Sequence, residues 1–253
     1  MNAREYLKMG TILLAGLFAV VALGVLDASA AAEQKVGIRG QKGPITSKGV
    51  KEGMKTQELK SELPKAMFEG TPKNIKPTPT LEKYIDKPRP PFLVPEGCTN
   101  LAKDKPVTSS DSMPIIGELD LVTDGDKEGT DGSYVELGPG LQWVQIDLKE
   151  PCEIFAILFW HYHAEGRVYH DVVIQVADDA DFIEGVKTIC NNDYDNSSGL
   201  GIGKELEFIE DYRGRLIDAG GVKGRYLRMY SAGNTSNDQN HYIEVEVYGK
   251  PAK

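Results

Sequence analysis

Four carboxylates crowd eight consecutive residues, Asp124-Gly-Asp-Lys-Glu-Gly-Thr-Asp131. Negative charges this close repel one another unless water or a cation neutralises them. Acidic side chains that alternate around glycines also leave carbonyl oxygens pointing inward, and calcium takes six to eight oxygen ligands at about 2.3–2.6 Å. The stretch is therefore either a calcium-binding loop or a solvated acidic turn.

Imidazole, phenol and guanidinium groups gather in a second stretch, which contains His161, Tyr162, His163, Arg167, Tyr169 and His170. On a strand, His161 and His163 share one face, a spacing that zinc sites also use, and His170 is a candidate third ligand. Alternatively, aromatic rings stack on the apolar face of a sugar while imidazole and guanidinium groups bind its hydroxyls. A third interpretation is that these side chains hydrogen-bond the loops to one another.

Two further stretches, 191–198 and 233–241, are dense in amides, carboxylates and hydroxyls. Such side chains favour turns because they hydrogen-bond the nearby backbone. The same groups also bind hydroxyl-rich ligands. Tyr194, Asn234 and His241 therefore join the candidate ligand contacts.

The sequence lacks the motifs of the common enzyme classes. It has no phosphate-binding glycine loop, no Gly-x-Ser-x-Gly elbow and no Cys-x-x-Cys pair. The formal net charge of −9 and the pI near 5.1 argue against nucleic-acid binding, which requires a basic surface. The sequence thus predicts a non-catalytic protein.

The 253 residues divide into three stretches of different composition. Residues 1–30 combine a basic start, an uncharged run and an Ala-x-Ala site, which predicts a cleaved signal peptide, although the run is also close to the length of a membrane anchor. Residues 31–96 carry 13 basic and 8 acidic side chains and nine prolines. This composition predicts a basic, proline-rich linker that is largely extended or disordered.

Residues 97–253 carry 14 basic and 28 acidic side chains and read as short β-strands separated by Gly, Asn and Asp. Residues 143–148 alternate strictly between two faces, and 153–160 form a nearly continuous apolar run, typical of a strand buried on both faces. In residues 242–248, Ile243, Val245 and Val247 are expected on one face. Many short strands without long helices predict a β-sandwich.

Five blocks of this stretch resemble discoidin domains, also called coagulation factor 5/8 type C domains. In chain order they are Asn100–Ser110, Val122–Asp126, Gln142–Leu148, Arg225–Arg228 and Ile243–Gly249. The resemblance covers Cys98 to Gly249. It implies an all-β, galactose-binding-like jelly-roll sandwich, a fold of binding modules that includes many carbohydrate-binding modules, and the fold alone does not fix the ligand.

The resemblance also implies a calcium site. In discoidin-like carbohydrate modules, a loop of the form D-G-x-x-x-x-T and a glutamate that opens the last strand bind calcium. The matching residues here are Asp124, Asp126, Thr130 and Glu244. Many secreted relatives close the sandwich with a disulfide between their first and last strands. Here the last strand has no cysteine, so at most one pair of Cys98, Cys152 and Cys190 can bridge, or all three stay reduced.

Together these observations predict an exported, non-catalytic module that binds carbohydrate on an extracellular or cell-envelope polymer and holds a structural calcium. Its location would be secreted, periplasmic or envelope-associated, with no membrane span after signal cleavage. The alternative is a protein–protein or structural component of the cell envelope; a metal-dependent hydrolase is a third. The candidate ligand contacts are His161, Tyr162, His163, Arg167, Tyr169, Tyr194, Asn234 and His241.

Overall fold

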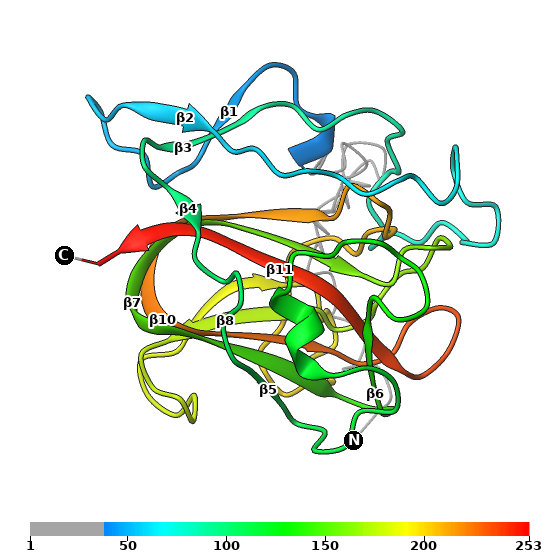
Figure 1. Ribbon diagram of the computed structural model, residues 1–253. Helices are drawn as coiled ribbons and strands as arrows, with labels where there is room; N and C mark the ends of the chain where they lie inside the picture. Colours follow the sequence, from blue (N-terminus) through cyan, green and yellow to red (C-terminus); the bar gives the residue numbers. More distant parts are fainter. Residues whose placement is uncertain (1–37, 253) are drawn as a thin grey trace, which may run out of the picture. The chain divides into compact units, whose positions relative to one another are not determined.

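The computed structural model describes residues 38–252, and the predicted signal peptide at residues 1–30 lies outside them (Figure 1). Strands dominate the described chain, and the only helices within it are two short 3-10 turns. The elements are η1 (Ile38–Gly40), β1 (Ile45–Thr46), β2 (Thr56–Glu58), β3 (Phe92–Pro95), β4 (Thr99–Asn100), β5 (Val107–Ser109), η2 (Leu119–Thr123), β6 (Val135–Leu137), β7 (Gln142–His161), β8 (Val173–Ala177), β9 (Lys187–Asn191), β10 (Arg215–Ser231) and β11 (Asn240–Pro251). Within this range, no helix has the length and apolarity needed to cross a membrane.

Eight strands form one large sheet that folds back on itself. Its order is β4-β11-β7-β10-β8-β9, with β5 beside β7 and β6 beside β11. The long strands β7 and β10 pair over almost their whole lengths, with register shifts in the middle. Because β5 pairs with the first half of β7 and β11 with the second half, the sheet turns between Leu148 and Cys152 and its halves form two layers.

Alternate residues of β7 fill the core between the layers. Val144, Ile146 and Leu148 point inward and are at most 2% exposed, as the alternation predicts. They belong to the same apolar cluster as Ile157 and Phe159 from the second half of the strand. The predicted all-β sandwich is confirmed.

One residue of β11 faces away from the side that alternation predicts. Val245 and Val247 enter the sandwich core, whereas Ile243 belongs to a second apolar cluster. The register between β11 and β7 shifts between Tyr242 and Glu244. An extra residue in one strand exchanges the faces of the residues around it, and the sequence pattern gives no sign of it.

The second half of β7 is buried on both faces, as its continuous apolar run predicts. Ala156, Leu158 and Trp160 point away from the sandwich core and are fully buried. Phe92 and Val94 of β3 belong to the cluster that covers them. β3 is the middle strand of a small sheet of order β1-β3-β2, drawn over the large sheet in Figure 1.

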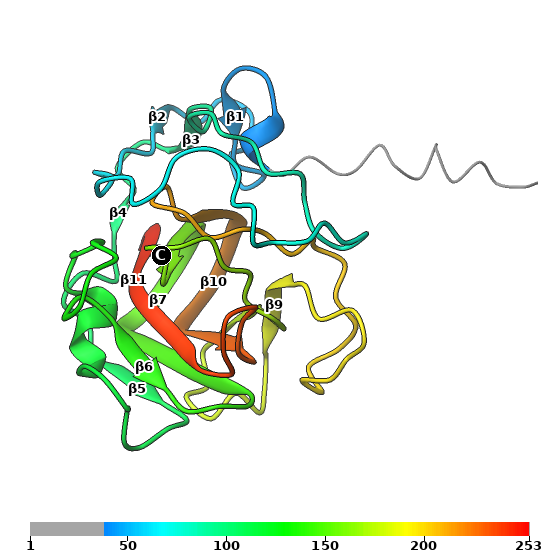
Figure 2. The same ribbon diagram turned by 90° about the vertical axis from the view of Figure 1, so that its right-hand side faces the viewer.

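Residues 38–96, called the N-terminal segment below, run along the sandwich (Figure 2). They are hydrogen-bonded to it at several places. Ser47 Oγ donates to Asp218 Oδ1 at 2.7 Å, and the Tyr248 hydroxyl donates to the Lys60 carbonyl at 3.1 Å. All of the described residues, 38–252, belong to one compact unit. The sequence predicts a linker here. The described part of this segment is packed on the sandwich, where Phe92 and Val94 cover the outer face of β7.

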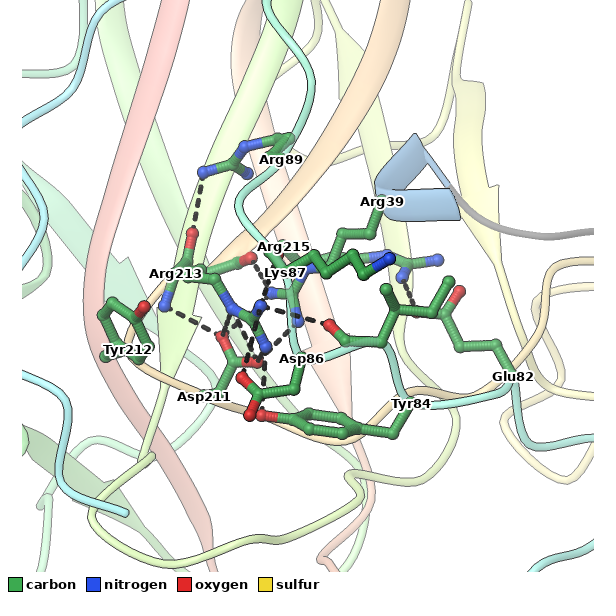
Figure 3. Close-up of polar contacts among 12 residues, drawn as sticks. Arg39, Glu82, Tyr84, Asp86, Lys87, Arg89, Asp211, Tyr212, Arg213 and Arg215 are labelled. Atoms are coloured by element: carbon green, nitrogen blue, oxygen red, sulfur yellow. Dashed lines mark hydrogen bonds and ion pairs between the residues drawn. The ribbon is translucent and has the colours of Figure 1, made fainter. Parts of the chain in front are cut away.

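A buried arginine holds the N-terminal segment to the sandwich (Figure 3). Arg213 is 1% exposed, and its guanidinium donates to the Asp211 carboxylate at 2.6 Å. The same guanidinium donates to the carbonyls of Ile85 at 3.1 Å and Lys87 at 2.5 Å and to the Tyr84 hydroxyl at 3.0 Å. The five N–H donors of an arginine allow one side chain to bind a carboxylate and several carbonyls together.

Two further arginines complete this cluster. Arg39 pairs with Asp211 at 2.6 Å, and Arg89 donates to the Arg213 carbonyl at 2.8 Å. Burial acts to raise the pKa of Asp211, but the hydrogen bond from Arg213 and the charge of Arg39 outweigh it and hold that pKa below its usual value. A depressed carboxyl pKa stabilises the fold above the pKa of the unfolded chain, and this stabilisation is lost as the pH falls through the folded pKa.

The three cysteines are buried free thiols. Burial raises the pKa of Cys98 and Cys152, and it raises the pKa of Cys190 to about 12. Of the alternatives that the sequence leaves open, the structure has the one without a disulfide.

We expect Arg213→Met to lower the free energy of unfolding by about 3–5 kcal/mol, because Asp211 would stay buried without its main partner. Urea unfolding at pH 7 measures the change. Arg225→Met is the matched control, since Arg225 pairs with Asp147 at 2.7 Å at the surface, where solvent screens the pair. The control should lose much less stability, and equal losses in the two variants would contradict an anchoring role for Arg213.

Candidate functional site

Three loops meet at one end of the sandwich, where β7, β9 and β10 end and β8, β10 and β11 begin. They are residues 162–172, 192–214 and 232–239. The first and third are joined by backbone hydrogen bonds, including one from His170 N–H to the Gly233 carbonyl at 3.1 Å. Most of the predicted ligand contacts lie in these loops or at the strand ends beside them.

Three of the predicted ligand contacts form a buried chain that is linked by hydrogen bonds and by one ring stack. His161 Nδ1 lies 2.6 Å from Glu210 Oε1, and the His161 ring stacks on Tyr169 with the ring centres 4.3 Å apart. The Tyr169 hydroxyl lies 2.9 Å from His241 Nδ1, and His241 Nε2 lies 3.0 Å from Glu136 Oε2. His161, Tyr169 and His241 are at most 3% exposed.

Burial disfavours the charged forms of His241 and Tyr169. It lowers the pKa of His241 to about 4, and the nearby positive charge of Arg167 acts in the same direction. Burial also raises the pKa of Tyr169 well above its usual value. Buried side chains that already contact one another offer little to an outside ligand, so this geometry favours the interpretation in which they hold the loops together.

Other members of the histidine stretch contact the acidic loop or one another. His163 Nε2 lies 2.9 Å from the Lys127 carbonyl, which ties the acidic loop to residues 162–172. The Arg167 guanidinium lies 4.4 Å from the centre of the Tyr162 ring and pairs with Glu165 at 2.5 Å. Arg167 is buried and Tyr162 half-buried.

The zinc interpretation requires His161, His163 and His170 around one ion. Each instead contacts a different acceptor: Glu210, the Lys127 carbonyl and Glu207. Within residues 38–252, one group of metal-binding side chains has its ligand atoms within 4.8 Å of one another, and its members are Asp171, Asp193 and Asp195. The structure does not bring the histidines together.

The other two predicted contacts differ in exposure. Asn234 is buried and shapes its own loop, since its Oδ1 accepts the N–H groups of Ser236 at 2.9 Å and Asn237 at 3.2 Å, and its Nδ2 donates to the Gln239 carbonyl at 2.9 Å. Tyr194, at 36% exposed, is the predicted contact most open to solvent.

The acidic loop lies against Glu244, as the calcium prediction requires. The Gly125 N–H donates to Glu244 Oε2 at 2.9 Å, while Glu244 Oε1 is buried without a partner. Burial raises the pKa of Glu244 to about 8, although the Gly125 hydrogen bond opposes it. Asp124 Oδ1 accepts the Asp126 N–H at 2.7 Å, and Thr130 is exposed.

Two of these four residues, Glu244 and Asp124, have the chemistry to hold a hard cation, but Asp124, Asp126 and Glu244 are not a group whose ligand atoms lie within 4.8 Å of one another. A buried carboxylate oxygen without a donor destabilises the fold, and a bound cation would relieve this penalty. Glu244 and Asp124 supply the carboxylate oxygens that calcium prefers. The site joins chain regions 119 residues apart, so an ion here would stabilise the fold rather than react.

Three cavities, of about 460, 380 and 340 Å³, lie between the N-terminal segment and the sandwich. The third, called the loop-end pocket below, is lined by Asn74, Ile75, Lys76, Thr78, Leu81, Val168, His170, Glu207 and Thr235. Sequence reasoning missed this pocket because one wall comes from the stretch interpreted as a linker. Of its lining residues, His170 was singled out in the sequence, but as a zinc ligand.

No protein-family profile and no curated protein sequence matches the chain. Solved structures similar to it include a family 89 glycoside hydrolase from Clostridium perfringens, with 20% identity, a TM-score of 0.46, and coverage of 60% of this chain and 15% of the hydrolase. They also include a fucose-binding module from Streptococcus pneumoniae, with 20% identity, a TM-score of 0.42, and coverage of 59% and 97%.

A third similar structure is chitosan-binding module 1 of a chitosanase/glucanase from Paenibacillus sp. IK-5, with 18% identity, a TM-score of 0.40, and coverage of 60% of this chain and 99% of the module. In contrast to the two binding modules, the glycoside hydrolase is much longer than this chain, which spans only about 15% of its length. At these identities the likeness concerns the fold alone.

We expect Tyr169→Phe to lower the free energy of unfolding by about 1–3 kcal/mol, because the buried His241 Nδ1 would lose its hydrogen-bond partner. Tyr194→Phe is the control, since it removes the same hydroxyl from an exposed ring. Chemical denaturation of both variants measures the difference. If Tyr169→Phe is as stable as the control, the buried chain does not hold the loops.

Proposed function

We propose that this chain is an exported, non-catalytic module that recognises carbohydrate on an extracellular or cell-envelope polymer. The observation that carries the proposal is the loop-end pocket. It has apolar and hydrogen-bonding side chains around one cavity of about 340 Å³, beside loops rich in amides and hydroxyls. This volume lies at the lower end of the range for small-molecule sites.

The chemistry of the pocket suits a sugar. A pyranose has an apolar C–H face, and its hydroxyls both donate and accept hydrogen bonds. Leu81 and Val168 supply apolar surface, while His170, Glu207 and Thr235 supply donors and acceptors. The exposed ring of Tyr194 adds an aromatic surface among the polar residues of its loop.

The histidine–carboxylate pair with the shortest contact is closed to a substrate, unlike the longer His170–Glu207 contact in the pocket, and this favours binding over catalysis. The shortest histidine–carboxylate contact within residues 38–252 joins His161 and Glu210 at 2.6 Å, and both side chains are fully buried. A general base must reach the proton that it abstracts. This pair is covered by aromatic rings, including Tyr169 and Tyr242.

A protein–protein role remains the second candidate, and one surface feature favours it. Met113, Ile115 and Ile116 are exposed within one short loop. Apolar side chains grouped at a surface are typical of protein contacts. Such a role would make the chain a structural component of the cell envelope without a sugar ligand.

The expected result for the full chain is retention on at least one polysaccharide of an immobilised panel, with Tyr194→Ala weakening retention at least fivefold. Tyr226→Ala is the control, because Tyr226 is a half-buried aromatic residue of β10 opposite Ala177, at the other end of β8 from the loops. Both variants should unfold at the wild-type midpoint. Failure to bind any polysaccharide would overturn the carbohydrate proposal, and capture of an envelope protein instead would establish the second candidate.

We also propose a structural calcium between the acidic loop and Glu244. Metal bound only by the folded state stabilises it by about 2.7 kcal/mol at a hundredfold excess over Kd. Each kcal/mol raises the melting temperature by roughly 2–4 °C for a domain of this size. A chelator should therefore lower the wild-type midpoint by several degrees.

In this experiment Glu244→Gln should remove the response to chelator, because it replaces the buried carboxylate with a neutral amide. Glu128→Gln is the matched control, since Glu128 is exposed on the same loop, and its response should resemble that of the wild type. An unchanged wild-type midpoint, with no calcium in the purified protein, would make the loop a solvated turn.

A further inference from the structure

We infer that the loop-end pocket holds one neutral pyranose ring and that residues 74–81 of the N-terminal segment form the wall against which it packs. This inference rests on the proposed function and adds the position of the sugar and the part of the chain that selects it. The wall belongs to a stretch whose composition alone suggests only a linker.

Backbone hydrogen bonds fix the end of this wall against the loop 192–214. Leu81 forms a parallel bridge with Glu207. The Glu82 N–H donates to the Glu207 carbonyl and the Glu207 N–H donates to the Thr80 carbonyl, both at 2.9 Å. The segment thus binds both the N–H and the carbonyl of Glu207, so the position of the Glu207 side chain depends on the segment.

A close contact fixes the beginning of the wall. Asn74 Nδ2 donates to the Gly166 carbonyl at 3.2 Å. A methyl group added at Gly166 would overlap the ring of Pro72. The segment can approach the loop 162–172 this closely only because residue 166 has no side chain.

The polar side of the pocket consists of three side chains joined by hydrogen bonds. Thr80 Oγ1 donates to Glu207 Oε2 at 2.7 Å, and Glu207 Oε1 lies 3.3 Å from His170 Nδ1. The hydrogen bond to Glu207 raises the pKa of His170, although burial opposes it. With Nδ1 engaged by Glu207, the half-exposed His170 ring has Nε2 left to bind a hydroxyl.

The apolar side is a small cluster that is separate from the sandwich core. Leu81, Val168 and Ile209 are buried together, and Ile75 packs against them. Leu81 and Ile75 belong to the N-terminal segment, so half of this surface is lost if the segment moves. The Thr235 hydroxyl accepts the Val168 N–H at 3.1 Å and keeps its own proton for a ligand.

The mixture of groups indicates a neutral sugar. One face is apolar and the surrounding groups include hydroxyls, an amide, an imidazole and a carboxylate, which match a ring with one C–H face and hydroxyls at its edge. The charges of Lys76 and Glu207 have opposite sign, so the pocket carries no strong charge of one sign to select an ionic ligand. The volume admits a single ring with part of its neighbour.

The test titrates the full chain with methyl pyranosides of galactose, glucose, mannose, fucose and N-acetylglucosamine, and with methyl glucuronide, while following backbone amide signals by NMR. We expect a neutral glycoside to shift amides in both 74–81 and 168–170. Ile75→Ser and Gly166→Ala should each weaken its binding at least tenfold. Leu63→Ser is the matched control, since Leu63 is a partly exposed residue of the same segment that lines the 460 Å³ cavity instead.

The outcomes separate this inference from the proposed function. If the wild type binds a neutral glycoside but both variants bind it equally well, or its signals shift only around Tyr162 and Asn234, the pocket assignment is wrong and carbohydrate binding stands. A preference for the glucuronide would overturn the neutral-ligand assignment. If no glycoside and no polysaccharide binds, both proposals fail. Unfolding midpoints of the variants, measured in parallel, exclude a loss of binding caused by unfolding.

Discussion

The burial of one ion pair, Arg213 with Asp211, decides how the two parts of this chain fit together. A proline-rich segment has few N–H groups to pair with a neighbouring strand, and its carbonyls still need donors when they are buried. Arg213 supplies those donors to Ile85 and Lys87, and Asp211 supplies the charge that allows the guanidinium to be buried. The cover over β7 and the wall of the loop-end pocket both belong to the segment held in this way.

Much of the fold was predictable because the alternation of apolar and polar residues along a strand shows which of its faces is buried. The alternating and continuous halves of β7 are visible in the sequence. The resemblance to discoidin-like modules implies that Glu244 lies beside the acidic loop, and in the structure a hydrogen bond from Gly125 joins the two. The bulge beside Glu244 was not predictable, because a register shift depends on the partner strand. The docking of residues 38–96 was missed because its buried apolar residues, such as Phe92 and Val94 of β3, form a run too short to stand out among the prolines.

The sequence predicts which residue types gather at the candidate site, but not which of those side chains are open to solvent. Residue types at His161 and Tyr169 fit both a ligand contact and an internal hydrogen bond, and only the fold shows that they face each other in the interior. His170 lies one residue after Tyr169 and opens to the loop-end pocket. Its partner Glu207 was invisible in the sequence because nothing marks a single carboxylate 37 residues away as a neighbour.

The long range of these contacts has a kinetic consequence. Arg39 and Asp211 are separated by 172 residues, and Tyr248 and Lys60 by 188. Folds dominated by such distant pairings form slowly, because the chain must close large loops before the contacts stabilise it. During synthesis the N-terminal segment emerges first, yet it cannot dock before β7 and the Asp211–Arg213 turn exist. The outer face of β7 therefore stays bare until late in folding, and this interval is when the chain is most exposed to aggregation.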